Sequence, residues 1–389
     1  MIRHLSQRHS VVVASLAESD RELQEGLGLK DYCDQLIAEV LPRPVRWMQA
    51  WQALFTGKPS SVAYFWSSKL KRRVQDALVR NKFDVIFVHC AFVAPYVYDI
   101  PDGFRILDFG DIDSAKWFAY SRWKPFPFSL GYGLEARKLR TFEKQVAARF
   151  HHCTVTAQGE LDEFHAFDIH RPCTLILNGF DSASFQTVTT QENHDPPVVA
   201  FVGRMDYFPN INGILYFANE ILPIIRRTVP RTELRIVGSN PGRKVRNLAR
   251  IPGVSVSGHV PDVRPYLVDA TVSVAPLRIA RGTQNKILEA MALGIPTVAT
   301  SEAAKGVRCV PGEHLLVADG PDAFADQVIK VIQNTALQKT LSEAGRRQVE
   351  QVHSWARSMD VLDDILKQVP TSGSESRISE FDTAQVRIL

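Results

Sequence analysis

Short apolar runs alternate with helical patterns along most of the 389-residue chain. The runs VVVASL, FDVIFVHC, FRILDFGD, HHCTVTA and TLILNG are apolar almost throughout, which is typical of parallel strands that are buried on both faces. A polar stretch, DSASFQTVTTQENHDPP, indicates an interdomain linker. The series then restarts with VVAFV, ELRIVGS, GVSVSGHV, VSVAPL and IPTVATS. The sequence therefore predicts two doubly wound, Rossmann-like α/β domains.

These patterns also predict the limits of the domains. We expect an N-terminal domain over residues 1–182, a C-terminal domain over 195–345, a closing helix over 346–369 and a loose tail over 370–389. A domain of this type opens with a strand, a glycine-rich turn and a helix. This sequence opens with MIRHLSQRHS, which resembles that helix, so we expect the first domain to lack its opening strand.

Composition excludes several classes of protein. A formal net charge of +4 is too small to indicate a nucleic-acid-binding protein. The five cysteines show no CxxC spacing, so neither a zinc site nor a disulfide framework is predicted. No stretch approaches the roughly 20 apolar residues of a membrane span. We therefore expect a cytoplasmic protein.

The stretch RGTQNKILEAMALGIP, residues 281–296, combines a polar loop with a short amphipathic helix. Thr283 is placed to cap a helix from Gln284 to Leu293, and Gly294 is placed to end it. The free N–H groups and the positive dipole at the start of such a helix bind anions. The stretch therefore predicts an anion site.

Lys286 and Glu289 are three residues apart and share a face of this helix. In a nucleotide site the lysine would contact the diphosphate and the glutamate the ribose hydroxyls. Gly203 and Arg204 follow the strand VVAFV. The glycine would let the backbone approach the ligand closely, and the guanidinium of the arginine would bind phosphate oxygens. The alternative is that Lys286 and Glu289 form a solvated surface pair and that Arg204 and Arg281 are merely exposed charges.

Three stretches carry a resemblance to a known family: FVGRMDYFPNINGILYFANEILPIIRRTVP, GHVPDVRPYL and APLRIARGTQNKILEAMALGIPTVATSEAAKG. They resemble the nucleotide-binding half of retaining GT-B glycosyltransferases of the family 4 type. With LDFGDIDSAKW, they are more specifically similar to the sugar transferases associated with exosortase (PEP-CTERM) and exopolysaccharide gene clusters. The resemblance implies two domains facing across a cleft, a nucleoside-diphosphate-sugar donor, retention at the anomeric carbon, and neither a metal nor another cofactor.

The sequence departs from this family at two positions of the donor site. Of two glutamates in the family pattern only the second, Glu289, is present, and Arg281 stands at the first. A lysine that follows the arginine of the GR loop is also absent, with Asn210 near its place. The resemblance implies that the donor is bound by Gly203, Arg204, Arg281, Gly282, Thr283, Gln284, Asn285, Lys286 and Glu289.

Candidates for catalysis lie in both halves. Asp111 and Asp113 follow the strand FRILDF, where carboxylates could orient an acceptor hydroxyl, or could instead cap the next helix. His89 also ends a strand, and we interpret it as a hydrogen-bonded structural residue. Lys286 would stabilise the leaving diphosphate, which could itself accept the acceptor proton.

Two basic stretches, SSKLKRRVQDALVR and GLEARKLRTFEKQVAARF, have helical periodicity. They predict either ordinary helices with a solvated charged face or attraction to anionic lipid, which would bring the enzyme to a lipid-linked acceptor. The aromatic residues between them would form core or the wall of an apolar acceptor site; they are Trp117, Trp123, Phe126 and Phe128.

The sequence as a whole predicts a hexosyl- or related sugar transferase of exopolysaccharide biosynthesis, cytoplasmic or peripheral on the inner membrane face. Two alternatives remain. One is a nucleotide-binding scaffold without activity, which the shortened first domain would tolerate. The other is a nucleotide-sugar epimerase, because that activity uses the same architecture.

Overall fold

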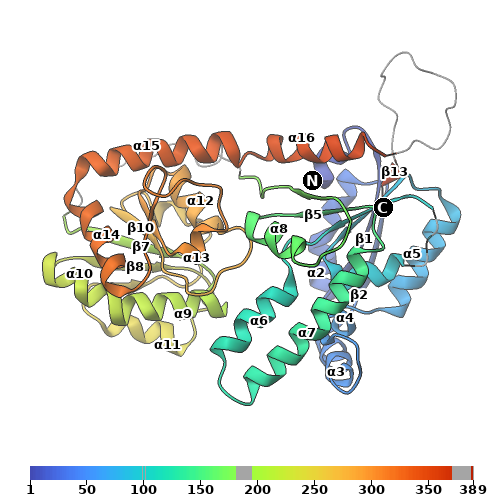
Figure 1. Ribbon diagram of the computed structural model, residues 1–389, viewed down its shortest axis with the longest axis horizontal. Helices are drawn as coiled ribbons and strands as arrows, with labels where there is room; N and C mark the ends of the chain where they lie inside the picture. The colour runs from blue at the N-terminus through green and yellow to red at the C-terminus, as the bar shows by residue number, and fades with distance from the viewer. Residues whose placement is uncertain (99, 101, 181–194, 370–386, 389) are drawn as a thin grey trace, which may run out of the picture. The chain divides into compact units, whose positions relative to one another are not determined.

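The computed structural model describes residues 1–98, 100, 102–180, 195–369 and 387–388. It forms two compact units. Unit 1 comprises Met1–Thr156, Glu160–Ile176 and Met359–Leu389, and unit 2 comprises Ala157–Gly159 and Leu177–Ser358. Each unit is built on its own parallel sheet (Figure 1). The predicted linker lies largely outside the described residues, as does most of the predicted tail.

The sheet of unit 1 has the strand order β2-β1-β13-β3-β4-β5-β6. Its strands are β1 (Ser10–Ala17), β2 (Gln35–Val40), β3 (Val85–His89), β4 (Phe104–Asp108), β5 (His152–Val155), β6 (Cys173–Leu175) and β13 (Arg387–Ile388). All of its pairings are parallel. The predicted apolar runs are confirmed as strands. The position between β1 and β3 is taken by β13, which pairs with Val11 and Val85 through Ile388.

Unit 1 contains helices on both sides of this sheet in the chain order typical of a doubly wound fold (Figure 1). Their bounds are α1 (Ile2–Leu5), α2 (Asp20–Glu25), α3 (Arg43–Ala53), α4 (Ser60–Tyr64), α5 (Ser68–Arg80), α6 (Asp113–Trp123), α7 (Phe128–Ala147), α8 (Gln158–His165) and α16 (Trp355–Leu366). The 3-10 segments Gly26–Tyr32 and Ala91–Val97 add to these.

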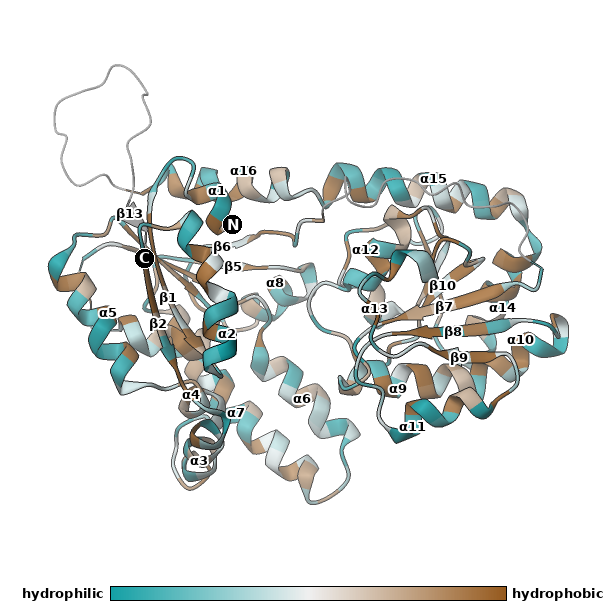
Figure 2. Ribbon diagram, turned by 180° about the vertical axis from the view of Figure 1, so that it is seen from behind, coloured by the Kyte–Doolittle hydropathy of each residue, from teal (hydrophilic) through white to brown (hydrophobic). Residues whose placement is uncertain are grey.

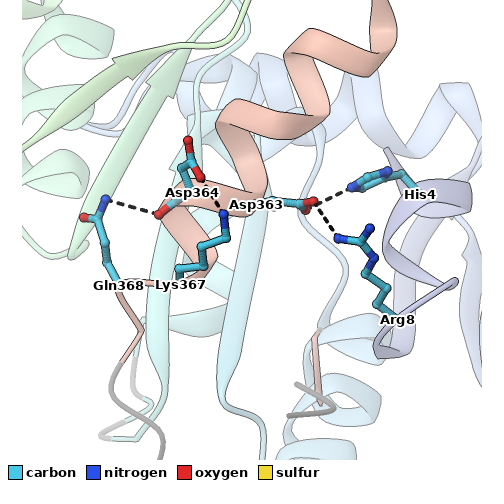
Figure 3. Close-up of polar contacts among 6 residues, drawn as sticks. All are labelled: His4, Arg8, Asp363, Asp364, Lys367 and Gln368. Carbon is cyan, nitrogen blue, oxygen red and sulfur yellow. Dashed lines mark hydrogen bonds and ion pairs between the residues drawn. The ribbon is translucent and has the colours of Figure 1, made fainter. Parts of the chain in front are cut away.

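The last helix of the chain packs against the first segments. Leu362 and Ile365 of α16 lie in one buried cluster with Leu5, Val11 and Val85. Figure 3 shows the polar contacts beside this cluster, where Asp363 accepts hydrogen bonds from His4 at 2.9 Å and Arg8 at 3.3 Å. Just past the end of this helix, Lys367 donates to Asp364 at 2.8 Å.

These contacts divide the end of the chain differently from the expected ranges. The sequence suggests a single closing helix over residues 346–369. Instead, α15 (Thr335–Val352) ends before α16 begins at Trp355, and the residues from Met359 onward group with unit 1. The reason is burial, because α16 covers apolar residues of β1 and β3.

The sheet of unit 2 has the strand order β12-β11-β10-β7-β8-β9. The strands are β7 (Val198–Val202), β8 (Glu233–Val237), β9 (Val254–Val256), β10 (Val272–Ala275), β11 (Thr297–Ala299) and β12 (Leu316–Val317). All five residues of β7 are buried, and the strands of both sheets are drawn largely in the hydrophobic colour in Figure 2. The second doubly wound unit is confirmed.

Helices of unit 2 are α9 (Phe208–Tyr216), α10 (Leu222–Thr228), α11 (Arg243–Arg246), α12 (Asn285–Ala292), α13 (Ser301–Ala304), α14 (Pro321–Gln333) and α15. Between α9 and α10, residues Phe217–Ile221 form a π-helical turn. Pro223 explains it, because proline has no N–H to donate and crowds the preceding turn. Among the described residues, no helix combines the length and the apolar character that crossing a bilayer requires.

Candidate functional site

Two loops meet at the carboxyl edge of the unit 2 sheet. Gly203 follows β7 and Gly238 follows β8. A Cβ on Gly238 would lie 1.7 Å from the carbonyl oxygen of Gly203, and a Cβ on Gly203 would lie 2.7 Å from Asn210. Only glycine fits at these approaches, so the two loops form a tight backbone ledge where ligands bind in folds of this kind.

Asn210 connects this ledge to α12. Its side chain is buried, with 5% exposed. The amide Nδ2 donates to the carbonyl of Arg204 at 2.9 Å, and Oδ1 accepts from Nζ of Lys286 at 2.6 Å. An amide can make both bonds, whereas a lysine at this position would place a second ammonium beside Lys286. The bond to Lys286 therefore accounts for asparagine near the place of the family's lysine.

The helix expected from residue 284 begins one residue later, because α12 spans Asn285–Ala292. The prediction that Thr283 caps it is wrong. Gln284 occupies the cap position with φ −91° and ψ 84°, without a side-chain cap bond, and its amide donates instead to the carbonyl of Arg281 at 3.0 Å. No side chain of the cap residue bonds to the first turn, and within that turn the N–H of Ile287 donates to the carbonyl of Gln284 at 2.9 Å.

The predicted end of the helix is confirmed. Gly294 has a φ of +74° and directly follows the C-cap residue Leu293. Its N–H bonds to the carbonyl of Met291 at 2.9 Å, and the N–H of Ile295 bonds to the carbonyl of Ala290 at 2.9 Å. A glycine in the left-handed region closes the helix in this way without steric strain.

Lys286 and Glu289 are half-buried, so the interpretation as a solvated surface pair does not describe them. Burial lowers the pKa of Lys286 to about 8, and the nearby charge of Glu289 partly opposes this. Burial likewise raises the pKa of Glu289, against the effect of Lys286. Two poorly solvated charges of opposite sign in the first turns of a helix are suited to a ligand with both anionic and hydroxyl groups.

Arg204 is held differently from Lys286. Its guanidinium makes a fork with Asp206, at 3.2 Å from Nε to Oδ1 and 3.0 Å from the terminal nitrogen to Oδ2. The side chain is 74% exposed. Among the other expected donor residues, Arg281, Thr283 and Gln284 are half-buried and Asn285 is exposed. Gly282, with a φ of +60°, packs against Gly306, where a Cβ would lie 2.2 Å from its carbonyl oxygen.

In unit 1, Asp113 does not cap the helix that follows. Ile112 is the N-cap residue of α6 and makes no side-chain cap bond. Asp113 instead pairs with Lys116 at 2.9 Å, and Asp111 is half-buried. The alternative of helix capping is therefore wrong for Asp113.

Two buried glutamates hold the backbone of this loop. Glu160 accepts the N–H of Ile112 at 2.7 Å, and Glu143 accepts the N–H of Ser114 at 3.1 Å. Burial raises the pKa of Glu143 to about 8. These bonds fix the loop, which lies at the carboxyl edge of the unit 1 sheet.

His89 and Asp108 form a pair that the sequence interpretation misses. They are aligned across β3 and β4, and Nδ1 of His89 lies 2.7 Å from Oδ2 of Asp108. Thr154 donates to the other carboxylate oxygen at 2.8 Å. The imidazole is 69% exposed while the carboxylate is 9% exposed. The signal was available, because each residue ends its strand in neighbouring parallel strands.

The hydrogen bond to Asp108 raises the pKa of His89 to about 10. We expect Asp108→Asn to return this pKa toward the ordinary 6.5, because an amide does not stabilise the imidazolium. A raised pKa contributes stability that is complete below pH 6.5 and is lost as the pH rises through about 10. The free energy of unfolding should therefore differ between the two proteins more at pH 6 than above pH 10.

NMR titration of the histidine ring signals tests this expectation. The other histidines serve as internal controls, and their titrations should be the same in both proteins. A His89 signal that titrates identically in the Asp108→Asn variant would contradict the assignment.

The comparisons with known proteins agree with this architecture. Residues 196–334 match the family model of glycosyl transferases group 1, and this matched region contains Gly203, Asn210, Lys286 and Glu289. Among curated proteins, none matches this sequence.

Solved structures similar to the chain share its fold at low identity. Anabaena Alr3699/HepE in complex with UDP matches with a TM-score of 0.65 and 14% identity, over 92% of this chain and 99% of that one. Sucrose-phosphate synthase from Thermosynechococcus elongatus matches with a TM-score of 0.62 and 18% identity, over 86% and 82%. The α,α-trehalose 6-phosphate synthase from Burkholderia multivorans matches with a TM-score of 0.61 and 11% identity, over 94% and 100%. The chain has the GT-B fold of two Rossmann-like domains.

Proposed function

We propose that this chain is a glycosyltransferase that moves a sugar from a nucleoside-diphosphate-sugar to an acceptor with retention of anomeric configuration. The observation that carries the proposal is the bonded set of Arg204, Asn210 and Lys286, which joins the ledge after β7 to the start of α12 within residues 196–334. In this assignment Lys286 contacts the diphosphate, Glu289 the ribose hydroxyls, and Arg204 and Arg281 supply further positive charge.

The proposed chemistry uses groups of the chain and of the substrate. The bond between the anomeric carbon and the diphosphate oxygen breaks while the acceptor oxygen bonds to the same face of that carbon. The departing diphosphate takes up the acceptor proton. Lys286 stabilises the negative charge that develops on the diphosphate, which is the step at which a fixed cation contributes most. Asp111, Asp113 and His89 of unit 1 are proposed to bind the acceptor.

The proposal includes a biological setting. We infer a lipid-linked acceptor in exopolysaccharide assembly, of the kind served by exosortase-associated transferases, and action at the cytoplasmic face of the inner membrane. No metal or other cofactor is assigned to the reaction. The UDP and UDP-glucose complexes of Anabaena Alr3699/HepE make UDP-sugars the first donors to test.

Nucleotide binding and donor turnover separate this proposal from its alternatives. Calorimetry with UDP, GDP and ADP tests for the site, and NMR of the anomeric signals follows a bound sugar nucleotide with and without a lipid-linked acceptor. A transferase consumes the donor faster when acceptor is present and gives a product of unchanged anomeric configuration. An epimerase alters the donor without acceptor, and a scaffold binds nucleotide without turnover. Inversion at the anomeric carbon would exclude the retaining mechanism.

A further inference from the structure

Helix α3 has its apolar face turned outward. Large apolar residues at Trp47, Met48 and Trp51 are 66%, 53% and 62% exposed, and Leu54 and Phe55, just beyond the helix, are 55% and 76% exposed. At the spacing of an α-helix, all five residues fall on the same face. The residues that α3 buries are small or charged, namely Arg46, Ala50 and Ala53. An amphipathic helix in a soluble domain normally buries its large apolar residues. An exposed apolar face of this kind is therefore typical of a surface that contacts a partner or a membrane.

A second group of exposed apolar residues lies at the junction of α6 and α7. The exposed fractions are 40% for Trp123, 81% for Phe126, 64% for Phe128, 59% for Leu130 and 50% for Leu134. Of the two interpretations of these aromatic residues, the one that places Trp123, Phe126 and Phe128 in the core is therefore wrong. Figure 2 shows hydrophobic segments along the part of α7 that follows this junction.

The two groups belong to one surface. Leu130, Leu134 and Lys138 lie four residues apart and follow one stripe of α7. Nζ of Lys138 donates to the carbonyls of Leu54 and Thr56, at 3.4 and 2.6 Å. The stripe therefore leads from the α6–α7 junction to the end of α3. We call these ten residues the apolar surface: Trp47, Met48, Trp51, Leu54, Phe55, Trp123, Phe126, Phe128, Leu130 and Leu134.

The exposed charges on the segments that carry the apolar surface are positive. The sequence contains no acidic residue between Glu39 and Asp76, nor between Asp113 and Glu135. Lys58, Arg122 and Arg137 are exposed on the segments that carry the apolar surface. Such a combination of tryptophan, phenylalanine and leucine with lysine and arginine is suited to the interface of an anionic bilayer.

The basic residues of α5, which the sequence suggested for this role, are used within unit 1. Lys69 and Arg73 both pair with Glu39, and Lys71 donates to the carbonyls of Pro95 and Tyr96 at 3.1 Å. Cations held in this way give less attraction to lipid, because each already has an anionic or carbonyl partner.

We propose that the apolar surface of unit 1 inserts into the headgroup region of a membrane that contains anionic lipid. The proposal assigns the suggested peripheral membrane attachment to a defined surface of unit 1. It rests on the proposed function in one respect, namely that attachment would bring the enzyme to a lipid-linked acceptor. A second copy of the chain fits this surface less well, because two copies of one basic face repel each other.

Sedimentation with vesicles tests the proposal. We compare the unaltered chain with Trp51→Ser/Phe55→Ser and with Phe126→Ser/Phe128→Ser, using vesicles of phosphatidylcholine with and without phosphatidylglycerol. The unaltered chain should bind the anionic vesicles, and each double variant should bind at least about tenfold more weakly because it buries less apolar area in lipid. Salt at about 1 M, where charges are screened beyond ~3 Å, should weaken binding of the unaltered chain.

Matched controls make the outcomes distinct. Val79→Ser on α5 and Val310→Ser in unit 2 remove residues that are 88% and 51% exposed outside the apolar surface, and both should bind as the unaltered chain does. UDP binding should be unchanged in every variant, so loss of vesicle binding with normal UDP binding supports the proposal even if transfer fails. Normal vesicle binding by both double variants, or a change only from dimer to monomer, would overturn it.

Discussion

Lys286→Ala should lower the rate of sugar transfer by about two orders of magnitude, the usual cost of removing one fixed donor from a site of developing negative charge. Lys286 is held by Asn210 at 2.6 Å, so its ammonium is already positioned before the diphosphate departs. Donor binding should weaken less than turnover, because the charge on the diphosphate is larger in the transition state than in the ground state. Initial rates at saturating donor and calorimetric nucleotide affinity measure the two effects separately.

The same variant should change how stability depends on pH. The pKa of Lys286 is lowered from 10.5 to about 8 in the folded chain, so between these values the unfolded chain binds more protons at this residue and the contribution of Lys286 to stability rises with pH. Urea unfolding at pH 7 and pH 10 should therefore give a change in the free energy of unfolding that is more favourable in the unaltered protein than in Lys286→Ala. The opposite contribution of His89 is common to both proteins and cancels in this comparison.

Lys330→Ala, which changes an exposed lysine of α14, is the matched control. It should leave the transfer rate and the pH dependence unchanged. Equal rates for the two variants in folded protein would remove Lys286 from the site.

Glu289→Gln should reduce nucleotide affinity about tenfold or more. The substitution keeps the size of the side chain but removes charge-assisted hydrogen bonds to ribose hydroxyls, each contributing roughly 1.5–3 kcal/mol. Folding should not be impaired, because burial already disfavours the charged form of Glu289. Calorimetry with the nucleoside diphosphate, compared with inorganic diphosphate, should show the loss only for the ligand that carries ribose.

Glu343→Gln on α15 is suited as a control, because its partner Arg347 lies 4.0 Å away and both side chains are more than half exposed. Its nucleotide affinity should match that of the unaltered chain. If Glu289→Gln and Glu343→Gln bind equally well, the ribose assignment is incorrect.

Most strands could be predicted from the sequence because burial on both faces leaves continuous apolar runs. The strand β2 was missed for the opposite reason. Its residues Gln35–Val40 alternate between buried and more exposed positions, as suits its place at the edge of the sheet, and the run is short and partly polar. Nor did the sequence indicate β13, whose two residues lie in the predicted tail.

The helix of the candidate site was predictable from the sequence, whereas the contacts of its residues were not. The helix of residues 285–292 and its closing glycine follow from local periodicity. The hydrogen bond between Asn210 and Lys286 joins residues that are 76 positions apart in the sequence. Local sequence patterns do not predict contacts between residues so far apart. Thr283 is a good cap by residue type, but the backbone of Gln284 occupies the cap position. Local propensity thus predicted the helix, whereas packing between loops determined the residue at which it begins.

The way α16 completes unit 1 affects how the chain can fold as it is synthesised. Leu5, Val11 and Val85 leave the ribosome early, whereas Leu362 and Ile365, which share their cluster, follow only after the whole of residues 177–358. At 5–20 residues per second, unit 2 takes roughly ten to forty seconds to emerge. During that time unit 2 can fold alone, while the early segment keeps an apolar face open to chaperones and to other nascent chains.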